Sequence, residues 1–316
     1  MLVLAIRTES RELRLGARIY FLIDGGRLRL PTCILSAALL AVASTVAAQG
    51  VPAAIYTDPP ADAVHPAAME VVHIPSHGVA INSLIYTPSG PGPHPTIVIC
   101  HGFPGNEKNL DLAQVLRRAG WNAVTFDYRG SWGSPGSFRF AQNLEDADAV
   151  LTFLRDPGNA SKFGIDTKRI VLAGHSMGGW VTVLTAAHDH ALAGAILISA
   201  ADMGRMGEVE HHKLVTMTAD NMEGLAGCTP ESLAAELAQS AKRFQFDDAA
   251  DGLTNTRMLV LSANDGLAPD SDSLVKALQA KGNAQVRAIH IATDHSWSDH
   301  RIFLESTIVE WLAKLK

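Results

Sequence analysis

The residues best suited to chemistry form a short motif in the middle of the chain. The sequence Gly174-His-Ser-Met-Gly178 places Ser176 between two glycines. An apolar run precedes the motif and a helical pattern over 180–187 follows it, which is typical of a tight turn from a strand into a helix. Because backbones approach closely in such a turn, glycines are required, and the serine hydroxyl is left exposed. We predict that Ser176 is a nucleophile rather than an incidental serine in a glycine turn.

A nucleophilic serine needs a base to take its proton and a carboxylate to orient that base. In a strand–helix architecture the carboxylate is expected at the end of a later strand. Asp265 lies just past the apolar run 258–262, in the expected turn 263–266. Asp270 and Asp272 are rivals, but Pro269 and the pattern after it favour first-turn positions of a helix. We predict that Asp265 is the acid.

Three histidines near the end of the chain could serve as the base. His295 comes just after the apolar run 286–291, beyond the last predicted strand. His300 lies five residues further on, where the final helix is expected to begin. His290 lies inside the run and is interpreted as a core histidine with its hydrogen bonds satisfied. We predict that His295 is the general base.

Serine chemistry on a carbonyl also needs two N–H donors for the oxyanion. One is the backbone N–H of Met177, at the start of the helix. The other is expected in the loop that follows the first buried strand, where Gly102 lets the chain fold back and Phe103 can donate. Pro104 has no N–H group. We expect His101 to form a hydrogen bond within the loop and to shape it.

Short apolar runs along the chain predict the elements that would position these residues. Continuous apolar runs without polar alternation are typical of parallel strands that are buried on both faces. The runs cover 96–100, 122–126, 170–173, 195–199, 258–262 and the less pure 286–291, after two strands at 70–74 and 79–86. Helical patterns at 144–154 and from 302 onward lie between or after them. The fold class is predicted as α/β, with a doubly wound, mostly parallel sheet.

Three segments depart from this alternation. Residues 204–256 separate two strands by more than one crossover helix needs, and Thr229-Pro230 is a good helix start, so a helical cap is expected there. Residues 49–69 are rich in proline and predict a linker or arm. Within residues 1–48, arginines precede an apolar stretch that ends in small residues, which indicates a secretory signal cleaved after Ala48. A retained signal anchor is the alternative, and translation could begin nearer Arg27.

Composition narrows the classes of function. The 316 residues carry a net charge of −6 without a basic run, which argues against nucleic acid as a partner. The apolar stretch of the leader is shorter than the roughly 20 residues that cross a bilayer, so the mature chain is expected to lack a stable span. Of the three cysteines, Cys100 lies in an apolar run and is expected to be a buried thiol. The chain is expected to be periplasmic or secreted.

Together these motifs resemble the α/β-hydrolase superfamily. The resemblance rests on His101-Gly-Phe-Pro-Gly105, Asp127-Tyr-Arg-Gly-Ser-Trp-Gly133, Gly174-His-Ser-Met-Gly178, Asp265 and His295, and extends from about residue 70 onward. Within it the chain looks like bacterial serine aminopeptidases, prolyl-oligopeptidase-like hydrolases and small esterases. The resemblance implies that Asp127 and Arg129 form a structural turn. Proline iminopeptidases carry a second glycine where this chain has Phe103.

The resulting prediction is a serine hydrolase that cleaves a carboxylic ester of a small molecule through an acyl-enzyme. A peptidase or amidase that uses the same residues on a short peptide is the alternative, and a binding protein without turnover is the remote one. A peptidase would need a site for an amine, for which the cap offers Glu208 and Glu210, although a solvated helix face is the plainer interpretation. Trp297 either lines the pocket or packs in the core. The pairs His188/His190 and His211/His212 lack a full metal-ligand pattern, so no metal and no cofactor are predicted.

Overall fold

Strands and helices alternate along the chain from Ala68 onward. The computed structural model describes residues 22–23, 26–27 and 50–315, in two units that divide after Val51. In the first unit, β1 (Leu22–Ile23) pairs antiparallel with β2 (Gly26–Arg27). The predicted secretory signal otherwise lies outside the described residues. The second unit carries everything discussed below.

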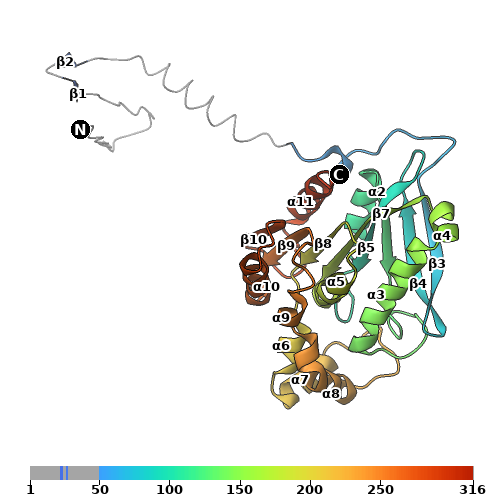
Figure 1. The fold of residues 1–316 in the computed structure, drawn as a ribbon, viewed down its shortest axis with the longest axis vertical. Helices are drawn as coiled ribbons and strands as arrows, with labels where there is room; N and C mark the ends of the chain where they lie inside the picture. The colour runs from blue at the N-terminus through green and yellow to red at the C-terminus, as the bar shows by residue number, and fades with distance from the viewer. Residues whose placement is uncertain (1–21, 24–25, 28–49, 316) are drawn as a thin grey trace, which may run out of the picture. The chain divides into compact units, whose positions relative to one another are not determined.

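The second unit is built on one large sheet (Figure 1). Its strands are β3 (Ala68–Ser76), β4 (Val79–Thr87), β5 (His94–Cys100), β6 (Asn122–Phe126), β7 (Ile165–His175), β8 (Gly194–Ile198), β9 (Met258–Ala263) and β10 (Val286–Ile291). They lie in the order β10-β9-β8-β7-β5-β6-β4-β3. Six neighbouring strands from β10 to β6 are parallel, whereas β4 and β3 join antiparallel. The predicted doubly wound, mostly parallel sheet is confirmed.

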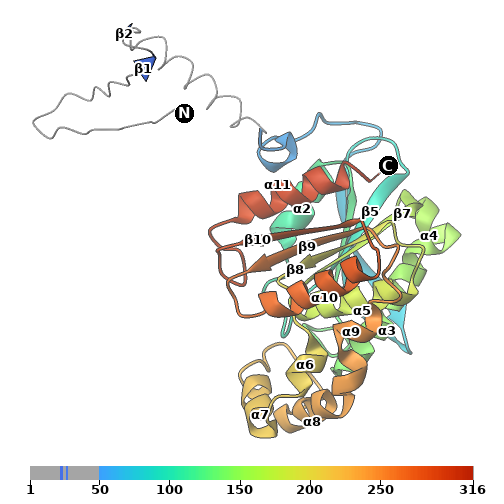
Figure 2. The same cartoon turned by 60° about the vertical axis from the view of Figure 1, so that its left-hand side comes forward.

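Helices cover both faces of the sheet (Figures 1 and 2). They are α2 (Leu110–Arg118), α3 (Phe140–Arg155), α4 (Pro157–Lys162), α5 (Met177–His188), α10 (Ala268–Ala280) and α11 (Arg301–Leu312). Because successive residues of a strand point to opposite faces, β5 contributes Ile97 and Ile99 to the core under α2 and α11. Val98 and Cys100 of the same strand enter the core under α3 and α5. Burial on both faces explains why the strands read as continuous apolar runs.

The segment between β8 and β9 is helical. It contains α6 (Met203–Gly207), α7 (His211–Ala219), α8 (Pro230–Ser240), the 3₁₀ helix η2 (Ala241–Phe244) and α9 (Phe246–Ala249). Figure 2 shows α6, α7 and α8 gathered at one end of the unit. Helix α8 begins at the expected Thr229-Pro230 pair, where the Thr229 hydroxyl accepts a hydrogen bond from the Ser232 amide. None of the helices in the described residues is long and apolar enough to cross a membrane.

The segment before β3 contacts helix α2. A short 3₁₀ helix, η1 (Ala53–Ile55), presents its carbonyl groups to Arg118 of α2, whose guanidinium donates to Ala54 O at 2.5 Å.

The first predicted strand starts two residues earlier than expected, at Ala68, and β7 starts at Ile165 rather than 170. The additional residues of β3 are exposed, and those of β7 include the polar run 166–169, so the apolar pattern did not include them.

Candidate functional site

Ser176 occupies the turn between β7 and α5. Its φ of 58° and ψ of −122° are conformations that side-chain-bearing residues rarely adopt, and such strain costs of order 1–3 kcal/mol. Gly178 allows the turn to pack on the neighbouring loop, because a β-carbon there would lie 2.1 Å from the carbonyl oxygen of Cys100. The serine remains partly exposed while both flanking residues are buried. The local geometry is that of an exposed hydroxyl on a strained strand-to-helix turn.

The structure brings His295 and Asp265 together. Nδ1 of the imidazole lies 2.8 Å from Oδ2 of the carboxylate, and the Leu267 amide donates to Oδ1 at 3.0 Å. Burial would raise the pKa of Asp265, but hydrogen bonds from His295, Leu267 and Ser199 outweigh it and hold the pKa below its usual value. The carboxylate therefore stays ionised and fixes the proton of His295 on Nδ1, which leaves the lone pair on Nε2.

Two buried side chains lie behind this pair. The indole Nε1–H of Trp297 donates to Ser199 Oγ at 3.0 Å, and both residues have positive φ, at 59° and 45°. Trp297 is fully buried, so its side chain packs in the core rather than lining a pocket. Ser199 comes directly after β8, which ends one residue earlier than the predicted strand over 195–199. Its positive φ turns the chain away from the sheet and toward Asp265.

His175, the residue before Ser176, contacts His295. The His175 ring lies 4.7 Å from the His295 ring, centroid to centroid, and its Nε2 lies 2.9 Å from the His295 carbonyl oxygen. Within the described residues no hydrogen bond joins Ser176 Oγ to His295. In enzymes without bound substrate such bonds are commonly long and shorten only when substrate binds.

The loop after β5 lies against Ser176. A β-carbon on Gly102 would lie 2.9 Å from the β-carbon of Ser176, which measures how closely the loop packs on the turn. His101 Nδ1–H donates to the Gly102 carbonyl at 2.7 Å, so the expected hydrogen bond within the loop is confirmed. Because the C=O and N–H of a trans peptide point in opposite directions, this bond turns the Phe103 N–H away from His101.

Helix α5 supplies the second predicted donor. Met177 is its first residue, and first-turn N–H groups have no partner inside their own helix. They also lie at the positive end of the helix dipole, which favours negative charge nearby. Asn143 of α3 packs beneath this turn and donates to the Met177 thioether at 3.4 Å. A negative charge that develops beside Ser176 would face these N–H groups.

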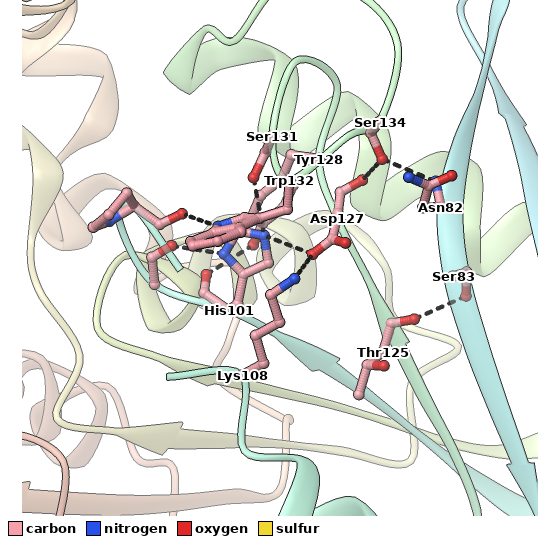
Figure 3. Close-up of polar contacts among 12 residues, drawn as sticks. Asn82, Ser83, His101, Lys108, Thr125, Asp127, Tyr128, Ser131, Trp132 and Ser134 are labelled. Carbon is pink, nitrogen blue, oxygen red and sulfur yellow. Dashed lines mark hydrogen bonds and ion pairs between the residues drawn. The ribbon is translucent and has the colours of Figure 1, made fainter. Parts of the chain in front are cut away.

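A polar cluster supports the loop from behind (Figure 3). Asp127 accepts from Lys108 Nζ at 2.7 Å, and its other neighbour is the His101 ring, at 3.7 Å from Nε2. Burial, with a smaller contribution from the Lys108 charge, lowers the pKa of His101 to about 4. His101 is therefore neutral near pH 7. The indole of Trp132 donates to the Pro104 carbonyl at 2.8 Å, which ties the other end of the loop.

Asp127 and Arg129 take part in structural contacts. Arg129 Nε donates to the fully buried Asp146 at 2.6 Å, and its Nη2 pairs with Glu145 at 2.5 Å. Asp127, as described above, is paired with Lys108. These bonds tie the segment after β6 to α3, in agreement with the structural turn that the resemblance implied.

The rival residues lie elsewhere. Asp270, in the first turn of α10, accepts from Arg205 Nη1 at 3.2 Å, and Asp272 is exposed. His300 caps α11 and contacts Asp299. The interpretation of His290 as a core histidine is wrong. Its ring is bonded to Ser262 and Asn264, but it is exposed, because β10 is the edge strand.

The acidic residues of the cap are exposed. Glu208 accepts from Gln245 Nε2 at 2.6 Å, and Glu210 pairs with Lys213 at 3.3 Å. His211 and His212 are exposed as well. The two glutamates lie in the turn between α6 and α7 rather than on a helix face, and all four side chains are solvated. Cys100 is buried, as predicted, and burial raises the pKa of its thiol to about 12.

Sequence reasoning assigned no role to two residues of this site. His175 belongs to the serine motif, where its flanking position is the only signal. Ser199 ends an apolar run, and a hydroxyl at the end of a buried strand could have marked it. Their contacts join residues that are 120 and 98 positions apart, which no local pattern shows.

Comparisons with known proteins agree with this geometry. A sequence model described as the alpha/beta hydrolase family matches residues 97–306, a range that includes the loop, the serine turn, Asp265 and His295. An uncharacterised 31.7 kDa protein from the traX-finO intergenic region of Escherichia coli is 35% identical over 122 residues. That match spans 37% of this chain and only 40% of the relative's length.

Two solved structures share the fold. Est1E from Butyrivibrio proteoclasticus, solved with ferulic acid bound, has a TM-score of 0.60 at 20% identity and covers 77% of this chain and 98% of its own. The acylaminoacyl peptidase of Pyrococcus horikoshii has a TM-score of 0.61 at 15% identity, over 94% of this chain and 45% of its own. At such identities the likeness shows the fold alone.

Proposed function

Since the chain belongs to the alpha/beta hydrolase family, we propose that it is a serine hydrolase that cleaves carboxylic esters through an acyl-enzyme. The observation that carries the proposal is the buried Asp265 carboxylate bound to His295 Nδ1 at 2.8 Å, beside a serine on a strained turn. A histidine held in this way presents an unprotonated Nε2, which is what a general base requires.

In the first half of the proposed reaction, Ser176 Oγ attacks the ester carbonyl carbon while its proton passes to His295 Nε2. The carbonyl oxygen becomes an oxyanion that faces the N–H groups of Phe103 and Met177. Asp265 stabilises the imidazolium that has formed. The intermediate then collapses: the C–O bond to the leaving alcohol breaks, and His295 returns the proton to that alcohol.

In the second half, a water molecule repeats the attack on the acyl group of Ser176. His295 takes a proton from the water, and the new oxyanion faces the same two donors. Collapse breaks the bond to Ser176 Oγ, which recovers its proton from His295. The products are a carboxylic acid and an alcohol, and the enzyme returns to its starting state.

Two features support an ester with an apolar acyl group. Phe103 packs on the buried rings of Phe138 and Phe140, at ring centroid distances of 5.7 and 5.2 Å, and is itself partly exposed, so the oxyanion loop presents one aromatic side chain. The acidic pair of the cap, which an aminopeptidase would need for a substrate amine, is instead bound to Gln245 and Lys213. A small apolar ester is the substrate class that these contacts favour.

The proposal is tested by comparing p-nitrophenyl acetate, butyrate and octanoate with aminoacyl p-nitroanilides. The full chain is assayed beside Ser176→Ala, which serves as the blank. We expect ester turnover that the blank lacks and no cleavage of the anilides. Anilide cleavage of comparable efficiency would replace the ester proposal with a peptidase. Activity that survives in the blank, or silence on both panels from folded protein, would overturn the serine mechanism.

We also propose that the chain is exported, on the evidence of the arginines, apolar stretch and small residues within 27–48. Expression in a bacterial host, followed by fractionation and N-terminal sequencing, tests this. A periplasmic or secreted product that begins at Gln49 is expected. A full-length product in the membrane fraction would indicate an anchor, and full-length protein confined to the cytoplasm would contradict export.

A further inference from the structure

His175 joins the two reactive regions of the molecule. It is the last residue of β7 and the covalent neighbour of Ser176, and it is buried. Its Nε2 lies 2.9 Å from the carbonyl oxygen of His295, across 120 positions of sequence. The mechanism above gives this side chain no part, although it is bonded to one reacting residue and hydrogen-bonded to the other.

The bond fixes the protonation of His175. A carbonyl oxygen only accepts, so Nε2 must carry the proton and Nδ1 must carry the lone pair. Nδ1 is buried and, in the part of the chain that the structure describes, has no hydrogen-bond partner. Burial and the His295 charge lower the pKa of His175 to about 4, so the ring stays neutral near pH 7. A buried nitrogen without a hydrogen-bond partner is unfavourable, so the presence of this histidine asks for an explanation.

His295 is thereby held at two points. Asp265 holds the side chain at Nδ1, whereas His175 holds the backbone at the carbonyl oxygen. The two imidazole rings also pack against each other, at 4.7 Å and an interplanar angle of 43°. Other bonds hold the loop on either side of His295, since the Asn264 amide donates to the Thr293 carbonyl at 3.1 Å and Arg301 Nη1 donates to the Ser296 carbonyl at 3.2 Å. The His175 bond is the contact that joins the His295 backbone directly to β7, the strand that leads into Ser176.

We propose that His175 is a positioning residue: its Nε2–H holds the His295 backbone so that the base lies within reach of Ser176 Oγ. The inference rests on the proposed function, because it concerns the distance between the nucleophile and its base. His175 exchanges no proton with substrate and touches no reacting atom. Its effect is on the rate of the acyl-transfer step and not on substrate binding.

Three substitutions of His175, each made in the full chain, test the proposal. His175→Gln keeps an N–H near the position of Nε2, whereas His175→Phe keeps the ring and loses the donor. A displacement of about 1 Å in a reacting group can cost on the order of 100-fold, so we expect His175→Phe to lower kcat about 10- to 100-fold. KM for p-nitrophenyl acetate should change little, and His175→Gln should recover most of kcat. His175→Asn, whose amide is too short to reach, provides a second comparison if the phenylalanine variant fails to fold.

His94→Phe is the matched control. His94 is the first residue of β5, at the end of the strand that lies away from the Ser176 turn. Its Nε2 lies 3.2 Å from the Gly90 carbonyl oxygen, so the same kind of bond is lost far from Ser176. We expect its kcat to match the parent. In a His295→Ala background, His175→Phe should have no further effect, since the residue acts through His295.

The outcomes separate the two proposals. Parental kcat in folded His175→Phe, or equal losses in the folded glutamine and asparagine variants, would overturn the positioning role. Loss of kcat in His94→Phe to the same degree would reduce the effect to general stability and would also overturn it. If Ser176→Ala retains activity, it is the serine mechanism that fails.

Discussion

Two histidine–aspartate contacts in the C-terminal part of the chain look alike by distance. His295 Nδ1 lies 2.8 Å from Asp265, and His300 Nδ1 lies 2.9 Å from Asp299. The two histidine side chains are 38% and 37% exposed, but Asp265 is 3% exposed and Asp299 is 69% exposed. The two pairs therefore differ in the exposure of the carboxylate and not in the exposure of the histidine.

The surroundings explain why only the first pair suits general-base catalysis. Asp265 receives bonds from Leu267 and Ser199 as well as His295, and the backbone of His295 is held by His175. Asp299 is bonded to Thr293 on the surface, where water and salt screen the pair. A short distance between an imidazole nitrogen and a carboxylate is therefore insufficient evidence for a catalytic pair. What distinguishes the first pair is that its carboxylate is buried and is held by further hydrogen bonds.

Removing each histidine should give the largest contrast. His295→Ala deletes the proposed base, and we expect kcat/KM for p-nitrophenyl acetate to fall by about four to six orders of magnitude. His300→Ala removes a helix-cap residue on the surface and should stay within about threefold of the parent. The comparison would break if both variants, shown by circular dichroism to be folded, lost activity equally.

Neutralising the carboxylate of each pair should give the second-largest contrast in turnover. Asp265→Asn should lower kcat by about 10³–10⁴, because an amide at this position favours the wrong tautomer of His295. The matched variant Asp299→Asn should keep parental kcat, since that carboxylate lies in solvent. Steady-state kinetics at saturating ester tests both. Parental kcat in Asp265→Asn would shift the acid role to another residue, with Asp270 the first to examine.

A smaller effect is expected from the serine behind the first pair. Ser199→Gly removes the hydroxyl bonded to Asp265 and relieves the positive φ, and losing a hydrogen bond to a charged group should lower kcat about tenfold. Ser83→Ala loses a buried hydroxyl that donates to the Thr125 carbonyl in the sheet (Figure 3), and its kcat should not change. Equal kinetics in the two variants would remove Ser199 from the account.

The last prediction concerns stability in acid and not turnover. With a pKa of about 4, His175 stays neutral in the folded chain at pH values where an unfolded histidine, with a pKa near 6.5, takes up a proton. Unfolding then binds protons between about pH 6.5 and 4, so stability should fall through that window, by up to about 3 kcal/mol for this group. Thermal midpoints across the window should fall less steeply with decreasing pH in His175→Gln than in the parent or Ser83→Ala. Identical slopes would show that His175 is not held neutral.

Much of this site could be predicted from sequence because chain order and strand ends determine it. Ser176 and Asp265 follow the buried strands β7 and β9, and His295 follows the edge strand β10. Because these strands are parallel, their carboxyl ends lie at one edge of the sheet. His290 was misplaced because the same apolar run describes a central strand and an edge strand, and only the sheet order separates them. The partners of His175 and Ser199 depend on side-chain packing between distant segments, so no spacing rule reaches them.

The central claim is that Ser176 carries the acyl group. Full-length protein is mixed with p-nitrophenyl butyrate, quenched in acid within one turnover and examined by intact and peptide mass spectrometry. The account predicts one butyryl group, on the peptide that contains Ser176, and a larger fraction of it in Asp265→Asn if deacylation slows more than acylation. Ester turnover with the butyryl group on another residue, or on none at any quench time in either protein, would contradict it.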